Sequence, residues 1–310
     1  LYLVTQVLLS ALRSVETVRI AFVISCVSLV VNVSINYTLI YGRFGFPELG
    51  IRGAAIGTMI SRCLEFLIVF IYVITIDKKL KLFSDKAVFH IDKLLRSDYV
   101  KVAVPVFISG MLWAISVPMQ TAILGHLSSD AIAANSVAST FYQYMKVVVL
   151  AMSSASSVMM GKAVGKGDLD EVKAAARTLS VLDVGIGIIL GAVLYFTKDF
   201  LLAQYTLSPT AAQLAEQLII IMAIVMVGMA YQMPVGSGII RGAGDTKFSL
   251  YVNMITWGIV LPLSLSAAFW WKWPIPAVVI CLQSDQIFKG LPIFLRFRSY
   301  KWIHKLTRDK

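Results

Sequence analysis

The chain has 310 residues, of which 58% are apolar and 15% charged, and its mean hydropathy is +0.80. A soluble domain carries about 25% charged residues, so this composition excludes an ordinary soluble protein and indicates one embedded in a membrane. The net charge of +11 would suggest nucleic-acid binding in a soluble protein, but in a membrane protein basic residues mark cytoplasmic loops, and we expect no nucleic-acid partner.

Apolar segments follow one another along the whole chain. Residues 1–13 are typical of the last turns of a helix, and the sequence starts at Leu1 in an apolar run, so we expect an N-terminally truncated fragment. Segments long enough to cross a hydrocarbon core of about 30 Å then fall at 17–42, 51–76, 101–125, 130–160, 175–197, 211–236, 248–271 and 273–295. The predicted fold class is an all-α polytopic membrane protein.

Lysine and arginine are distributed unevenly among the gaps between these segments. Alternate gaps and the C-terminal tail hold 21 of them, and the opposite gaps hold four. Because Lys and Arg accumulate in cytoplasmic loops, the side with 21 is predicted to be cytoplasmic. This predicts a multi-pass protein of the cell (inner or plasma) membrane with a cytoplasmic C-terminus.

The longest polar gap, at 78–100, mixes lysines with apolar residues. The pattern favours an interfacial amphipathic helix that joins two bundles, with a solvated linker as the alternative. We therefore divide the chain into four parts. They are the end of an N-terminal lobe at 1–77, a cytoplasmic inter-lobe linker at 78–100, a C-terminal lobe of six transmembrane helices at 101–295, and a basic cytoplasmic tail at 296–310.

Two pairs of motifs indicate an internal repeat. LRSVETVR at 12–19 is similar to IRGAGDTK at 240–247 with one gap, and AAIGTMISRCLEF at 54–66 aligns with AVVICLQSDQIFK at 277–289. The number of residues that separates the two copies is nearly the same in both pairs, as expected if the chain contains two related halves. With six spans per half, the predicted architecture is a two-lobed helical bundle of twelve helices, of which the chain carries about eight full helices and part of another.

Two asparagines interrupt the first full span. Asn32 and Asn36 lie one helical turn apart and share a face. In hydrocarbon each amide needs a hydrogen-bond partner, so both are expected to face the bundle interior. With an oxygen from a neighbouring helix, the two amide oxygens can bind Na⁺ or hydrogen-bond an acid that takes H⁺. Plain amide bonding between helices is the alternative.

Charged residues inside the spans come in pairs at helical spacing. Arg62 and Glu65 stand at i, i+3, and Asp285 and Lys289 stand at i, i+4. Each pair is either a structural ion pair or part of a central cleft, where the acid would attract a cationic substrate. Asp183 is predicted to be a buried acid bonded to a neighbouring hydroxyl, with a proton relay as the alternative.

A substrate surface is predicted from adaptable and aromatic side chains on several spans. Thioethers and aromatic faces suit promiscuous cation binding, although such residues are also ordinary membrane core. The candidates outside the ion pairs are Met111, Trp113, Gln120, Tyr142, Gln143 and Gln232. Lys146 is expected to snorkel or to face the cavity, and Glu216 to be solvated near the outer interface.

Three motifs together resemble the multidrug and toxic compound extrusion (MATE) family. They are IIRGAGDTKF at 239–248, NVSINYTLIYG followed by FPELGIRGAAIGTMISR at 32–62, and ILGHLSSDAIAANSVAST at 123–140. The resemblance covers essentially the whole chain, from the end of the family's fourth helix through its twelfth. It implies a two-lobed, twelve-helix architecture and the exchange of organic cations and other drugs for Na⁺ or H⁺ by alternating access.

The resemblance also implies a cation-coupling site in the N-terminal lobe. Asn32, Asn36 and Thr58 match the family's Asn, Asp/Asn and Thr, and the acid of the first helix would lie in the missing region. Because Asn36 stands where some members have Asp, the choice between Na⁺ and H⁺ stays open. Some members carry a glutamate where this chain reads GMLWA at 110–114, so a C-lobe cation site does not carry over.

The motif RGAGDTK at 241–247 is interpreted as structural. Gly242 and Gly244 permit a tight turn, and Asp245 is placed to cap the next helix. No His, Cys or acidic cluster of metal-binding or catalytic spacing is present, so we predict neither an enzyme nor a cofactor beyond the coupling ion.

The sequence therefore predicts a secondary active multidrug or organic-cation exporter driven by Na⁺ or H⁺ antiport. The expected partners are the lipid bilayer and small, cationic organic substrates, and the expected state is a monomer. A lipid-linked oligosaccharide flippase of the same superfamily is the alternative. A flippase cavity should be markedly cationic to hold pyrophosphate, whereas the embedded charges here are four acids and three bases, which favours cation export.

Overall fold

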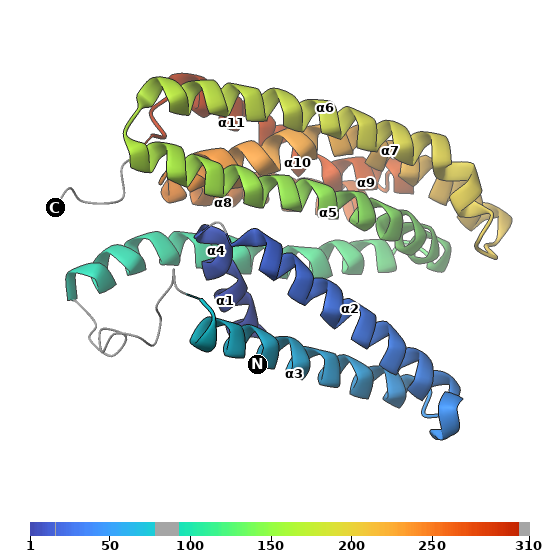
Figure 1. The fold of residues 1–310 in the computed structure, drawn as a ribbon. Helices are drawn as coiled ribbons and strands as arrows, with labels where there is room; N and C mark the ends of the chain where they lie inside the picture. Colours follow the sequence, from blue (N-terminus) through green and yellow to red (C-terminus); the bar gives the residue numbers. More distant parts are fainter. Residues whose placement is uncertain (16, 78–92, 304–310) are drawn as a thin grey trace. The chain divides into compact units, whose positions relative to one another are not determined.

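The structure is a computed structural model, and it describes residues 1–15, 17–77 and 93–303. The chain divides into two compact units, Leu1–Arg96 and Ser97–Lys310. The first unit is built from α1 (Tyr2–Ser14), α2 (Val18–Tyr41), the 3₁₀ helix η1 (Arg43–Gly45) and α3 (Ile51–Thr75) (Figure 1).

The second unit contains nearly all of α4 and every later element. Its helices are α4 (Lys93–Gly125), α5 (Ser129–Lys166), α6 (Leu169–Leu202), α7 (Pro209–Met233), α8 (Thr246–Leu265), α9 (Ile275–Gln283), α10 (Asp285–Phe288) and α11 (Gly290–Ser299). Two π-helical segments, η3 (Pro234–Ile240) and η4 (Ser266–Trp270), continue α7 and α8.

Within the described residues, eight helical stretches are long and apolar enough to cross a membrane. Two lie in the first unit and six in the second, which confirms the predicted all-α polytopic fold. Several helices extend beyond the predicted spans because their ends are capped. Gly167 ends α5 in the left-handed conformation, and the Asp168 side chain accepts hydrogen bonds from the backbone of Asp170 and Glu171 at the start of α6.

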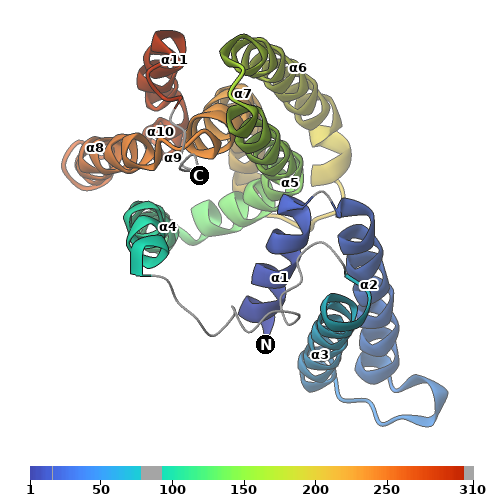
Figure 2. The ribbon, with the colours of Figure 1, turned by 60° about the vertical axis from the view of Figure 1, so that its left-hand side comes forward.

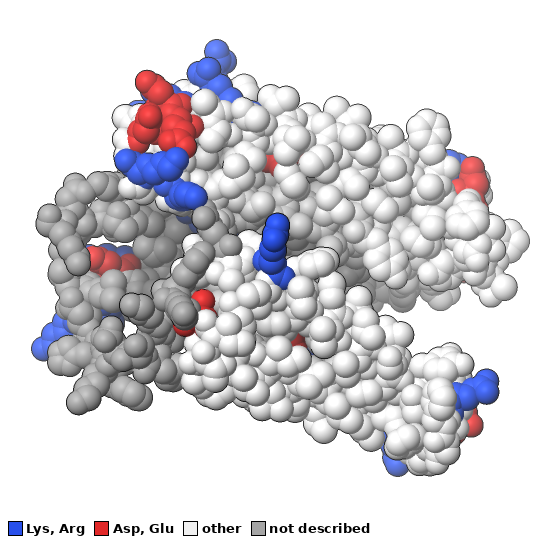
Figure 3. Space-filling view, in the orientation of Figure 1, with Lys and Arg blue, Asp and Glu red and all other residues white. Residues whose placement is uncertain are grey.

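The predicted amphipathic linker at 78–100 lies for most of its length outside the described residues. Its last part, from Lys93 onward, is the beginning of α4. At the other end of the second unit, the predicted tail from residue 296 begins within α11, which continues to Ser299. The charged side chains on the face in Figure 3 gather mainly near helix ends, and the long helix surfaces are mostly uncharged.

Small residues bring α2 and α3 close together in the first unit. The buried positions of α3 recur every fourth residue, and they are Gly53, Gly57, Ser61, Glu65, Val69 and Val73. A Cβ at Gly53 would lie 2.6 Å from the Leu39 carbonyl oxygen, so only glycine permits this approach. Such small-residue ridges are the usual way for membrane helices to pack, because lipid offers no hydrophobic driving force between them.

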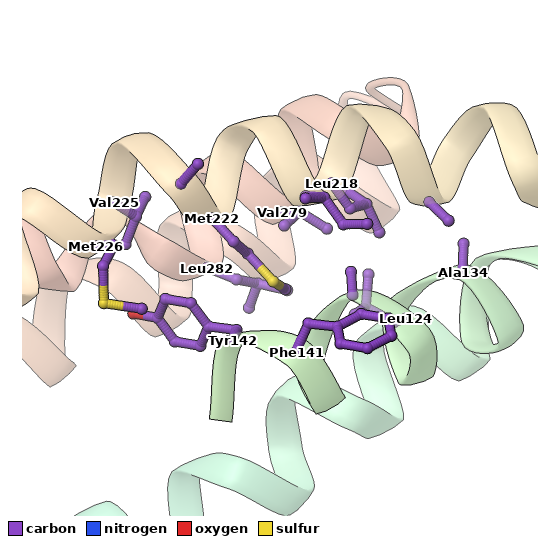
Figure 4. Close-up of a cluster of buried hydrophobic side chains, with 14 of the residues drawn as sticks. Leu124, Ala134, Phe141, Tyr142, Leu218, Met222, Val225, Met226, Val279 and Leu282 are labelled. Carbon is purple, nitrogen blue, oxygen red and sulfur yellow. The ribbon is translucent and has the colours of Figure 1, made fainter. Parts of the chain in front are cut away.

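Helix α7 forms the centre of the second unit and is the most buried of its spans. It packs against α5 and α6, which lie beside it in both ribbon views (Figures 1 and 2). One face meets Phe141 and Tyr142 of α5 through Met222 and Met226, with Leu282 of α9 closing the cluster (Figure 4). This packed core holds the polar residues of the unit in place.

The RGAGDTK motif makes the predicted turn between η3 and α8. Gly244 has a positive φ of 105°, and the Asp245 carboxylate accepts a hydrogen bond from the Phe248 backbone, which confirms the predicted cap. Gly242 serves a different purpose, since a Cβ there would lie 2.8 Å from Cα of Ser157 on α5. Asp245 also binds Arg296 of α11, whose Nη2 donates to Oδ2 at 2.6 Å.

Candidate cation-coupling and substrate sites

The two asparagines of α2 form a hydrogen-bonded ladder that reaches α3. Asn36 donates from Nδ2 to Oδ1 of Asn32 at 3.2 Å, and Asn32 donates from Nδ2 to Oγ of Ser61 at 2.9 Å. Ser61 in turn donates to the carbonyl oxygen of Thr58 at 2.9 Å. The spacing of one helical turn aligns the amides, and the small residues of α3 let the second helix reach them.

One oxygen at the end of this ladder is buried without a partner among the described residues. It is Oδ1 of Asn36. A Cβ at Gly57 would lie only 2.2 Å from that atom, so the glycine makes the space that the amide occupies. A buried acceptor left unsatisfied costs about 1–3 kcal/mol. A hard cation or the proton of an acid would each satisfy this oxygen.

Thr58 does not join the asparagines through its side chain. Its hydroxyl is exposed and donates to the Ala54 carbonyl oxygen at 2.9 Å. The structure therefore brings together two of the three predicted coupling residues and adds Ser61 and Gly57. The sequence already contained a pattern that could have indicated Gly57 and Ser61, because small residues recur at every fourth position of IRGAAIGTMISRCLEF.

The buried acid of the first unit is neutralised from its own helix. Arg62 donates from Nη1 to Oε2 of Glu65 at 2.6 Å. The Glu65 side chain is 3% exposed, whereas that of Arg62 is 46% exposed. The guanidinium also lies over the ring of Tyr2 on α1, 5.1 Å from its centroid. This pair thus has a buried acid and a base that reaches the edge of the unit.

The ion pair of the second unit is enclosed on both sides. Lys289 donates to Oδ2 of Asp285 at 3.0 Å, and both side chains are 9% exposed. Gln286 donates from Nε2 to both oxygens of Asp285, at 2.9 and 2.8 Å, and accepts at 2.7 Å from Gln232 of α7. Sequence reasoning missed Gln286, whose role depends on the approach of α7.

The other predicted substrate residues divide between interior and surface. Tyr142 is buried and donates to Sδ of Met229 at 2.9 Å. The ammonium of Lys146 lies 5.0 Å from the ring centroid of Trp113, and the charges of Asp285 and Lys289 also act on it. Three predicted candidates stand apart from this network: Met111 and Gln143 are exposed, and Gln120 is half-buried.

The structure contradicts the prediction made for Asp183 on α6. Its side chain is 1% exposed, and neither carboxyl oxygen has a hydrogen-bond partner among the described residues. The prediction that a neighbouring hydroxyl binds it is wrong, because the nearby turns of α6 and α7 meet through glycine and alanine. Glu216, which was expected to be solvated near the outer interface, has a side chain that is 44% exposed and forms an ion pair with Lys198.

The MatE family model matches residues 105–265, which is more than half of the chain. The chain belongs to the MATE family. Among curated proteins, this MATE chain is 26% identical over 281 residues to the uncharacterized transporter YisQ of Bacillus subtilis, covering 89% of this chain and 60% of that protein. The predicted family membership is confirmed.

Two further relatives carry drug-resistance names. The probable multidrug resistance protein NorM of Xylella fastidiosa is 29% identical over 251 residues, covering 79% of this chain and 52% of that protein. The multidrug resistance protein MdtK of Yersinia enterocolitica is 27% identical over 270 residues, covering 84% and 57% respectively. This MATE chain therefore spans about half to three fifths of the length of the curated relatives it matches.

Solved structures show the same fold. A mutant of the Vibrio cholerae MATE transporter VcmN aligns with a TM-score of 0.77 and 21% identity, covering 95% of this chain and 65% of that one. The eukaryotic MATE transporter AtDTX14 aligns with a TM-score of 0.78 and 17% identity, covering 94% and 64%. These likenesses place the helices of this MATE chain in the family's architecture.

Proposed function

We propose that this protein exports drug-like organic cations in exchange for Na⁺ or H⁺, through alternating access in the plasma membrane. Membership in the MATE family and the drug-resistance names of NorM and MdtK support export over the flippase alternative. The observation that carries the coupling mechanism is Oδ1 of Asn36, which is buried at the end of the Asn32–Ser61 ladder and has no hydrogen-bond partner in the part of the chain that the structure describes.

The ladder is suited to recognise a small cation or a proton. The Asn36 amide donates from Nδ2 to Asn32, and its oxygen accepts no hydrogen bond from the described residues. Gly57 lets that oxygen lie against the backbone of α3, since a Cβ at this position would come within 2.2 Å of it. A hard cation prefers oxygen ligands of this kind, and the proton of a carboxylic acid can donate to the same atom. Either ion would remove the cost of the unsatisfied oxygen.

The second unit supplies groups that suit an organic cation. Trp113 offers an aromatic face that already holds the ammonium of Lys146, so the same face can hold a substrate cation when Lys146 moves aside. Asp285 provides negative charge close by, balanced in this conformation by Lys289. We propose a monomer whose C-terminus lies in the cytoplasm, on the strength of the Lys and Arg distribution.

The test uses the complete gene product in proteoliposomes, with efflux of a fluorescent organic cation driven by an imposed Na⁺ or H⁺ gradient. Asn36→Ala should lose gradient-driven efflux, because the accepting oxygen is gone, while Asn253→Ala on α8 should retain it. Equal transport by Asn36→Ala and the parent would make the ladder a purely structural contact. If the parent moves no cation under either gradient but scrambles a lipid-linked oligosaccharide, the flippase alternative takes over.

A further inference from the structure

Asp183 is a buried acid that the proposed coupling site does not use. It lies near the middle of α6, a 34-residue helix, with its side chain 1% exposed. Both carboxyl oxygens lack a hydrogen-bond partner among the described residues. An ionised carboxylate in such surroundings would cost many kcal/mol, so the group is compatible with this conformation only when it carries a proton.

In the described part of the chain, no charged side chain lies within hydrogen-bond distance of this acid. Helices α5 and α7, with η3, are the main elements packed against α6. Residues 147–161 of α5 contain no ionisable side chain, and residues 217–240 of α7 and η3 contain only Tyr231. On α6 itself Arg177 donates to the hydroxyl of Tyr300. The carboxyl group is therefore isolated from every ion pair described above.

The register of α6 and α7 places Asp183 beside an irregular segment. Gly187 meets Ala230 so closely that a Cβ on the glycine would lie 2.5 Å from the alanine Cβ. Asp183 stands one turn before Gly187, and Pro234 stands one turn after Ala230. Because the two helices run antiparallel, Asp183 and Pro234 flank the same stretch of the interface.

Pro234 begins the π-helical segment η3. Proline has no N–H to donate, so the regular α-helical hydrogen bond is missing at this position, and π-helical turns often mark functional positions. The hydroxyl of Tyr231, in the same turn, is also buried without a partner in the described part of the chain. Two unsatisfied polar groups and a weakened helix thus occupy one region of the interface.

We propose that Asp183 is a proton-binding site of the second unit, closed in this conformation and opened to water at the α6–η3 contact around Pro234. When water enters, the carboxyl O–H bond breaks and the proton passes to a water molecule, which also solvates the carboxylate that remains. The site differs from the Asn32–Asn36 ladder in unit and in chemistry. It goes beyond the proposed function, since it would bind H⁺ whichever ion drives export.

The test measures the protonation state directly, without transport. Infrared difference spectra of the purified protein in lipid nanodiscs at neutral pH should show the carbonyl band of a protonated carboxylic acid. The band should be lost in Asp183→Asn, which has nearly the shape of the protonated acid. Asp170→Asn is the matched control, since Asp170 lies on the same helix with a side chain 94% exposed. Loss of a carboxylate band instead, in Asp183→Asn, would overturn the site.

Thermal unfolding gives a second readout that does not depend on the spectra. Ionised in the unfolded chain but protonated in the folded one, Asp183 binds more protons in the native state, so stability should fall as pH rises from acid to neutral. The decrease in stability per pH unit should be smaller in Asp183→Asn than in the parent, and unchanged in Asp170→Asn. Equal slopes in the parent and Asp183→Asn would contradict the proposal.

The route to water is tested by the variant Pro234→Ala. An N–H at position 234 should restore the regular helical hydrogen bond there and keep water out. Hydrogen–deuterium exchange at the Asp183 carboxyl group, measured as the isotope shift of its infrared band, should then be slower. Exchange as fast as in the parent would overturn the proposed opening at η3. Because none of these measurements requires efflux, failure of the proposed export function and failure of this site remain distinguishable.

Discussion

The two units each bury an acid and pair it on its own helix, but they complete the pair differently. Glu65 is enclosed while its partner Arg62 remains 46% exposed, so the first unit encloses only the acid of this pair. Asp285 and Lys289 are both 9% exposed, and amide groups of Gln286 supply the remaining hydrogen bonds. The difference shows that a fully enclosed ion pair needs a surrounding polar network, because Coulomb attraction alone does not offset the loss of hydration.

The largest effect is expected from breaking the enclosed pair. Lys289→Met should lower the free energy of unfolding by about 3–5 kcal/mol, because it leaves Asp285 as an uncompensated buried charge. The double variant Asp285→Asn/Lys289→Met should recover most of this loss. Chemical unfolding in lipid nanodiscs measures both. A double variant as unstable as the single one would show that the cost lies in packing instead of charge.

A smaller loss is expected from the half-exposed pair. Arg62→Met should destabilise the protein by about 2–3 kcal/mol, the cost of a buried acid that loses its hydrogen-bond partner. The loss should be smaller than for Lys289→Met because the Arg62 side chain is only partly enclosed, whereas that of Lys289 is 9% exposed. Measured under identical conditions, equal losses in the two variants would abolish the distinction between the units.

The ladder can be disturbed from the α3 side without touching an amide. Gly57→Ala should cost about 1–2 kcal/mol, because the new methyl group would meet Oδ1 of Asn36 and force the helices apart. Gly258→Ala on α8 is the control, since a Cβ there meets nothing within 4 Å. Denaturant unfolding of the two variants compares them, and equal stability would show that the asparagine simply rotates away.

The smallest effect is expected from the hydrogen bond between the helices. Ser61→Ala removes the acceptor of Asn32 and should cost about 0.6 kcal/mol, the average for such bonds in membranes. Ser34→Ala, on an exposed position of α2, should change the stability by less. The same unfolding assay, averaged over several repeats, measures this difference. A larger loss of stability in Ser61→Ala than in Gly57→Ala would contradict the expected order of the two effects.

Local patterns predicted those features of the molecule that depend on one helix. The pairs Arg62–Glu65 and Asp285–Lys289 follow from helical spacing, as does the bond between Asn32 and Asn36. The cap at Asp245 could likewise be read from its position before Thr246. Such contacts form in any conformation in which the helix itself forms.

The sequence by itself thus determined the membrane class, the helical spans, the family and the pairing of charges within each helix. Only the tertiary structure decided that Ser61, and not the Thr58 side chain, binds Asn32, and that Gln232 supports Gln286. It also left Asp183 without the hydroxyl partner that its position suggested. The physical reason is that these outcomes depend on the register between helices, which the small residues at their contacts set and no single helix contains.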